Sequence, residues 1–222
     1  TGTIINDDDE PLLPGETENK DQLFDKVYDG TEETDFYRAK SEGILNAQFD
    51  TKGGRDFIIG VFNAQSPQEI ETDAAISGSE IDTGDGDDVV IAESLQNILA
   101  IEGSQISTGE DADTISVVNS TSSNGFGING TPINPTTIDA GGGDDLIEVE
   151  SRETALVGFT FDDILLNGGD GNDTISVAGG NFGNAIGVGT IDGGSEDDLL
   201  ILGGSSTDYS YQLGSTELTG TI

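Results

Sequence analysis

A twelve-residue segment recurs six times along this chain and constrains its fold more than any other feature. The copies align without internal gaps, and their first residues are 25 to 32 positions apart. Recurrence at this period is typical of proteins built from stacked structural repeats. The copies are FDTKGGRDFIIG from Phe49, IDTGDGDDVVIA from Ile81, ISTGEDADTISV from Ile106, IDAGGGDDLIEV from Ile138, LNGGDGNDTISV from Leu166 and IDGGSEDDLLIL from Ile191.

Each copy has the pattern of a strand, a Gly/Asp turn and a second strand. The first and tenth positions are apolar in every copy, whereas the eleventh is Ser or Glu in half of them. Residues two apart on a strand point to the same face, so the tenth and twelfth positions indicate a buried face and the eleventh an outer one. One such unit cannot bury its apolar face alone, but stacked units can.

The repeat therefore predicts an all-β chain, a right-handed parallel β-solenoid of about six coils. One edge of the solenoid would be a row of Gly/Asp turns. Right-handed crossovers are the rule between parallel strands, and neighbouring coils would lie ~4.8 Å apart. The aromatic residues between 24 and 48 are expected to cap one open end, because an uncovered end exposes apolar side chains and unpaired strand edges.

Composition excludes several kinds of chemistry. The 222 residues include no Cys and no His, so disulfides, thiolate nucleophiles, imidazole bases and the common zinc sites are absent. The 44 acidic residues against 7 basic ones give a formal net charge of -37, which disfavours nucleic acid. No apolar stretch is long enough to cross a membrane as a helix, and no signal peptide is visible.

The eighth position is Asp in all six copies. Stacked coils would align these carboxylates in a column, where like charges about 5 Å apart repel. A hard cation with oxygen ligands removes that repulsion and joins adjacent coils, so the column predicts calcium. The alternative is that Asp only satisfies amides of the turn. Asn would serve that purpose equally well, yet no copy has Asn there.

The turns resemble the glycine-rich calcium nonapeptide G-G-x-G-x-D-x-U-x of the RTX (repeats-in-toxin) family. GGDGNDTIS at Gly168–Ser176 fits at every position, and TGDGDDVVI and AGGGDDLIE fit with one Gly replaced. The resemblance implies calcium held between neighbouring turns by Asp carboxylates and turn carbonyls. RTX rolls repeat the motif back to back, however, whereas this chain has one motif per coil.

The aspartate column, a second acidic position at the turn entrance and the resemblance together predict a set of calcium ligands. The predicted ligands are Asp82, Asp88, Asp113, Asp139, Asp145, Gly168, Asp170, Asp173, Asp192 and Asp198. The first copy departs most from the motif, since Lys52 and Arg55 lie inside its turn. We expect these two cations to replace the ion there.

The chain divides into four expected regions. Residues 1–22 form an extended acidic arm with a possible donor strand at 1–6, 23–48 a cap, 49–205 the solenoid, and 206–222 a C-terminal strand or cap. The opening TGTIINDDDEP resembles the closing strand of a Calx-beta domain, and TGTI recurs at 219–222. This recurrence is compatible with a unit of a tandem array, with a processed subunit whose strand completes a neighbour's sheet, or with chance.

Three classes of function remain open at this stage. The favoured one is a secreted, calcium-rigidified structural module of a bacterial surface layer, sheath, filament or adhesin, whose partners are its own copies or neighbouring domains. The second is an adhesin module that binds a glycan, with the segment Asn119–Pro135 as its best candidate. That segment holds two N-glycosylation triplets, at Asn119 and Asn129. The third, a polysaccharide-modifying enzyme, is disfavoured because cations and bases are scarce.

Overall fold

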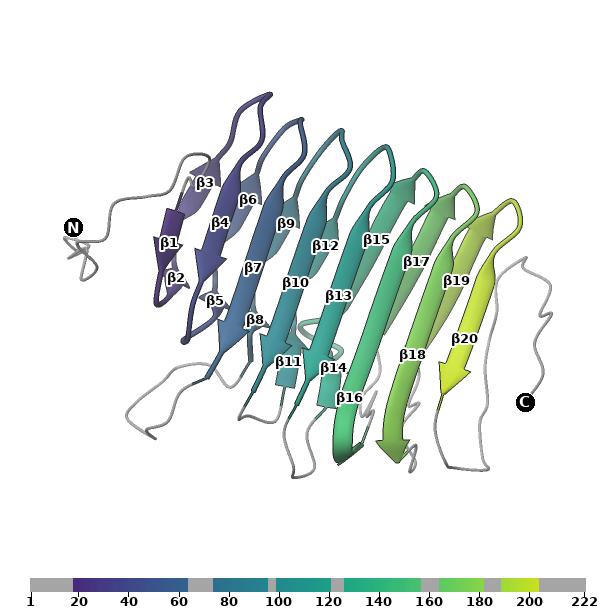
Figure 1. The fold of residues 1–222 in the computed structure, drawn as a ribbon. Coiled ribbons are helices and arrows are strands. Elements are labelled where there is room, and N and C mark those ends of the chain that lie inside the picture. The colour runs from purple at the N-terminus through teal and green to yellow at the C-terminus, as the bar shows by residue number, and fades with distance from the viewer. Residues whose placement is uncertain are drawn as a thin grey trace.

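In a computed structural model, the chain is all-β, and no helix occurs in the parts that the structure describes, which are residues 18–63, 74–95, 99–120, 126–156, 164–181 and 189–203. Within these ranges, twenty strands form three sheets in which all neighbouring strands run parallel. Strands of successive repeats lie side by side, from the purple N-terminal end to the yellow C-terminal end in Figure 1. The arrangement is that of a parallel β-solenoid, as the repeat predicts.

In the described part of the chain, sheet A has eight strands, sheet B five and sheet C seven. In sheet A lie β1 (Glu18–Lys20), β4 (Phe36–Ala39), β7 (Phe57–Phe62), β10 (Val89–Ser94), β13 (Thr114–Asn119), β16 (Leu146–Leu156), β18 (Thr174–Asn181) and β20 (Leu199–Gly203). In sheet B lie β2 (Leu23–Phe24), β5 (Ile44–Leu45), β8 (Ile76–Ser77), β11 (Leu99–Glu102) and β14 (Phe126–Asn129). In sheet C lie β3 (Val27–Asp29), β6 (Gln48–Asp50), β9 (Glu80–Asp82), β12 (Gln105–Ser107), β15 (Thr136–Gly142), β17 (Ile164–Asp170) and β19 (Gly189–Ser195).

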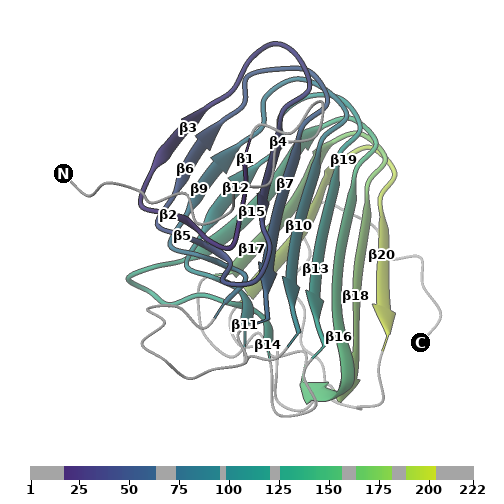
Figure 2. The ribbon, with the colours of Figure 1, turned by 60° about the vertical axis from the view of Figure 1, so that its left-hand side comes forward.

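The twelve-residue repeat is the corner where sheet C passes into sheet A. The first position of each copy lies on a sheet C strand and the tenth on the next sheet A strand, so Phe49 pairs with Ile81 and Ile58 with Val90. The turns between them follow one another along the upper edge in Figure 1, and Figure 2 shows the sheets wrapped around a common interior. The expected strand, turn and strand are therefore confirmed.

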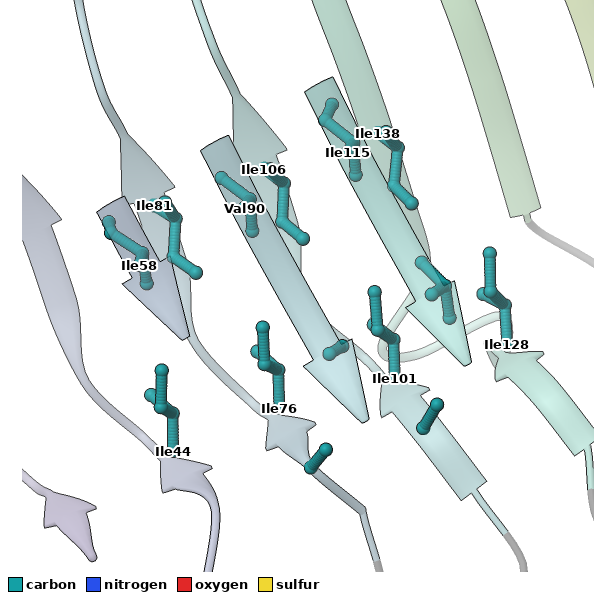
Figure 3. Close-up of a cluster of buried hydrophobic side chains, with 14 of the residues drawn as sticks. Ile44, Ile58, Ile76, Ile81, Val90, Ile101, Ile106, Ile115, Ile128 and Ile138 are labelled. Carbon is teal, nitrogen blue, oxygen red and sulfur yellow. The ribbon is translucent and has the colours of Figure 1, made fainter. Parts of the chain in front are cut away.

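Ladders of aliphatic side chains fill the interior. Figure 3 shows three of them: Ile58, Val90 and Ile115 from sheet A, Ile81, Ile106 and Ile138 from sheet C, and Ile44, Ile76, Ile101 and Ile128 from sheet B. Every residue in these ladders is at most 2 % exposed. Burial of a large aliphatic side chain contributes roughly 1.5–3 kcal/mol, so these rows are the main source of stability.

Residues 23–48, expected as a cap, contribute strands to the same three sheets. β2 pairs with β5, β3 with β6, and β4 with β7, each in the register of the later repeats. Aromatic rings fill the interior at this end: Tyr28 stacks on Phe49 with ring centroids 4.6 Å apart, and Tyr37 meets Phe49 edge-on. The expected donor strand at 1–6 and the C-terminal region 206–222 lie outside the described residues.

Candidate metal centre

The stacked turns are built on backbone conformations that favour glycine. The fourth and sixth positions of the turn have positive φ, as at Gly84 (84°) and Gly86 (133°). A Cβ on either glycine would also collide with a carbonyl of the preceding turn, because the turns are packed backbone against backbone. This close stacking brings equivalent residues of successive turns together, including the aspartates at the eighth position.

The eighth-position aspartates form a continuous hydrogen-bonded ladder, which we call the aspartate column. Each backbone N–H donates to Oδ1 of the aspartate one coil further on, as from Asp56 to Asp88 at 2.7 Å and from Asp88 to Asp113 at 2.8 Å. The same bond runs from Asp113 to Asp145, from Asp145 to Asp173 and from Asp173 to Asp198, at 2.7, 2.9 and 3.1 Å. One oxygen of each carboxylate therefore accepts a hydrogen bond from a backbone N–H of the preceding turn.

The second oxygen of these carboxylates is buried without a hydrogen-bond partner. This holds for Oδ2 of Asp56, Asp88, Asp113, Asp145 and Asp173. Burial raises the pKa of all five, to about 6 at Asp88, about 7 at Asp113 and about 6 at Asp145. An ionised carboxylate in such a place requires a positive partner or a further donor.

A seventh turn, at residues 30–35, precedes the six found in the sequence. Tyr28 and Asp35 occupy the first and eighth positions, and the N–H of Asp35 donates to Asp56 Oδ1 at 2.7 Å. Unlike the later aspartates, Asp35 receives donors from its own turn, because the N–H and hydroxyl of Thr31 lie 2.6 and 3.2 Å from its Oδ2. The column therefore starts with a carboxylate that is satisfied locally.

The residue at the third position of each turn lies inside the turn, beside the aspartate. It is Thr51, Thr83 or Thr108 in the three copies that we call the threonine turns (51–56, 83–88 and 108–113). Each hydroxyl donates to the third-position carbonyl of the next turn, at 3.0, 3.1 and 3.0 Å. One step earlier, Lys52 Nζ donates to the carbonyl of Gly30 at 3.0 Å. At the third position, side-chain donors thus join the turns up to Ala140; at the turn tips, Asn172 Nδ2 also donates to Asp144 Oδ1 at 3.0 Å and the Ser195 hydroxyl to Asp170 Oδ1 at 2.7 Å.

The last two copies have glycine at the third position, and we call them the glycine turns (168–173 and 193–198). A Cβ on Gly168 would lie 2.5 Å from the carbonyl oxygen of Gly193 and would collide with Asp173 Oδ2. A Cβ on Gly193 would collide with Asp198 Oδ2 in the same way. The carboxylate and the carbonyl therefore converge on a cradle that exists only because a side chain is missing. Neither Ala140 nor Gly168 has a hydroxyl to join its turn to the next.

The second acidic row lies apart from the aspartate column. Asp82, Asp139 and Asp192 alternate with buried residues on sheet C and so point to the outer face. They lie on one ladder, in which Asp50 pairs with Asp82 and Asn167 with both Asp139 and Asp192. Burial and the charge of Asp50 raise the pKa of Asp82. Within the described ranges no three carboxylates come together, so carbonyls would have to supply most ligands of an ion.

Two other sequence predictions have a clear place in the structure. Asp170 lies at the exposed tip of its turn, where its Oδ1 accepts the Ser195 hydroxyl at 2.7 Å rather than facing the cradle. Both glycosylation triplets have buried asparagines, Asn119 at 0 % and Asn129 at 8 % exposure, so the folded chain offers neither for modification. Arg55 packs over the Phe57 ring at 5.2 Å, which leaves Lys52 as the cation that joins the first turns.

Comparison with known proteins adds no family to these observations. No protein-family model, no curated protein and no solved structure matches this chain. Across the described ranges, no helix capable of spanning a membrane is found.

Proposed function

We propose that the chain is a calcium-stabilised structural module of a bacterial cell-surface assembly, a right-handed solenoid whose C-terminal turns are joined by Ca²⁺. The observation that carries the proposal is the cradle beside Gly168. There a buried, unpartnered carboxylate oxygen of Asp173 and the carbonyl of Gly193 converge on space that a Cβ would fill. Calcium takes six to eight oxygen ligands, including carbonyls, with flexible geometry, and this donor set suits it.

The side chain at the third position determines whether two successive turns need an ion to join them. Inside the turns, three hydroxyls and one ammonium already join the earlier coils, whereas Ala140 and Gly168 supply no donor there and the later turns are joined by side chains only at their exposed tips. We therefore place one ion, between the two glycine turns, because the methyl group of Ala140 occupies the equivalent space one coil earlier. Asp173 and Asp198 would be the carboxylate ligands, and turn carbonyls would complete the shell. The RTX resemblance is strongest in the same region.

Charge supports an extracellular setting. A chain with a formal net charge of -37 repels itself when folded, and divalent ions at millimolar concentration outside the cell would relieve that repulsion. The same chain in a compartment low in calcium would lack the ion between its two glycine turns and keep only their hydrogen bonds. Calcium would then act as a signal to complete folding after export.

The two ends of the solenoid favour head-to-tail contact between copies or with a neighbouring domain. Six of the seven cations lie in residues 20–55, where they face eight acidic residues and leave a net charge of only -2, whereas the last turn holds Glu196, Asp197 and Asp198. Eight strands in sheet A correspond to a rod of roughly 34 Å. The nearly neutral first end would repel the acidic last end of another copy less than two acidic ends repel each other, which would orient successive rods in one direction. We expect no catalytic activity from this module.

Substitution of Gly168 by alanine tests the proposal directly. The added methyl group fills the cradle, so Gly168→Ala should abolish the rise in melting temperature that calcium causes in the wild type. Gly53→Ala is the matched control, because its Cβ meets the end of the Glu32 side chain at 3.3 Å and no closer atom. A calcium response that persists in Gly168→Ala, or that Gly53→Ala abolishes equally, would contradict the proposed site.

A further inference from the structure

We propose that a groove along the corner between sheets B and C binds a neutral oligosaccharide. The groove has a volume of about 420 Å³ and lies on a different corner from the aspartate column. It crosses five successive rungs of the solenoid, from Asp25 in the first to Asn134 in the fifth. This binding site is independent of the proposed calcium joints.

The shape of the groove follows from two parallel rows of residues. One row is the start of sheet C, where Gln48, Glu80 and Gln105 are aligned in register and exposed. The other is the corner itself, where successive residues have φ near +50°, among them Gly78 (57°) and Gly103 (52°). Two glycines at adjacent rungs contribute no side chains of their own to this corner.

Amide side chains border the hollow at both ends and along one side. The Asn46 side chain leans over Gly78, where a Cβ would lie 2.5 Å from its Oδ1, and the Asn134 side chain leans over Gly103 in the same manner. Gln48 and Gln105 line the sheet C side. Asn134 belongs to the segment Asn119–Pro135 that the sequence singles out for glycan binding.

The chemistry of the lining selects neutral, hydroxyl-rich ligands. Each of the four amides offers both donors and an acceptor, which matches the dual character of sugar hydroxyls. The ammonium of Lys26 is already paired with Glu18 at 2.9 Å, and Glu80 accepts from Gln48 at 3.3 Å. An anionic sugar would approach a strongly acidic chain with no unpaired cation in the groove, so acidic polysaccharides are disfavoured.

The spacing between successive rungs of the groove also matches the spacing between successive sugars of a linear glycan. Adjacent rungs lie ~4.8 Å apart, about the length of one pyranose residue in an extended chain. A glycan lying along the solenoid axis would therefore present each successive sugar to an equivalent rung. Repetition of weak contacts along one chain gives useful affinity without a deep pocket.

Calorimetric titration with linear neutral hexasaccharides of glucose and of mannose, and with a hexasaccharide of uronic acid, tests the proposal. At least one neutral hexasaccharide should bind, and the double variant Gln48→Ala, Gln105→Ala should weaken binding about tenfold or more. Gln22→Ala, a glutamine outside the groove, should leave binding unchanged. Melting temperatures of all variants would show that they fold, because the altered side chains lie at the surface.

The outcomes separate this proposal from the calcium proposal. Binding of a neutral hexasaccharide that persists in EDTA supports the proposed glycan site, whether or not calcium joins the turns. Preferred binding of the acidic hexasaccharide, equal affinity in the double variant, or no binding of neutral hexasaccharides at millimolar concentration would each overturn it.

Discussion

Replacement of Asp113 by asparagine should stabilise the calcium-free protein at pH 8. Asp113 is 2 % exposed, its Oδ2 has no hydrogen-bond partner, and burial raises its pKa to about 7. An asparagine keeps the oxygen that accepts the N–H of Asp88 at 2.8 Å. Its Nδ2 can donate to the Thr108 hydroxyl oxygen, whose own proton goes to the carbonyl of Ala140.

The magnitude follows from the pKa. A rise from 3.8 to about 7 corresponds to on the order of 4 kcal/mol of differential free energy between the two protonation states. Because the folded-state pKa is raised, the folded chain binds more protons between these values, and stability falls as pH increases from about 4 to about 7. We expect Asp113→Asn to gain about 2–4 kcal/mol at pH 8 and little or nothing at pH 4.

Urea unfolding in EDTA across this pH range is the assay. Asp111→Asn is the control, because Asp111 is an exposed residue of the same turn and its substitution removes the same charge. The control should change stability by only a few tenths of a kcal/mol. A loss of stability in Asp113→Asn at pH 8, or a gain that does not depend on pH, would refute the reasoning.

Three further substitutions test individual joints of the turn stack. Thr83→Val removes a hydroxyl and leaves the buried carbonyl of the next turn unpaired, so urea unfolding should show a loss of about 1–3 kcal/mol, whereas Thr114→Val on the outer face should change little. Asp173→Asn should fold in EDTA but show no calcium-dependent rise in melting temperature; a rise equal to that of the wild type would exclude Asp173 as a ligand. Lys52→Met should lower the free energy of unfolding by about 1 kcal/mol. The difference between the variant and the wild type should shrink in high salt, and an unchanged stability would show that the ammonium contributes nothing there.

The sequence predicts the parts of the fold that repeat with a fixed period. The first, eighth and tenth positions recur at constant spacing, so the corner between sheets C and A and the alignment of Asp88 with Asp113 could be inferred before the structure. Sheet B could not, because strands such as β5 and β8 have two residues each and lie where the spacing between copies varies. No periodic signal survives in so short a strand.

The candidate site was only partly predictable, because it depends on the direction in which each side chain points and the sequence gives only the side chain's place in the repeat. The sequence aligns Asp82 and Asp88 in rows but does not show that one points outward and the other into the turn. The seventh turn escaped detection because Tyr28 and Tyr37 replace the aliphatic residues and Glu32 stands where glycine or aspartate is common. Recurrence of threonine at 51, 83 and 108 was the available signal for the hydroxyl joints.

The most direct test of the central claim is a crystal structure grown in calcium, with anomalous scattering measured at a wavelength where calcium contributes. We predict a peak between turns 168–173 and 193–198, within bonding distance of Asp173 Oδ2. We predict no peak among the threonine turns. An empty cradle beside Gly168, or equal peaks along the whole aspartate column, would contradict it.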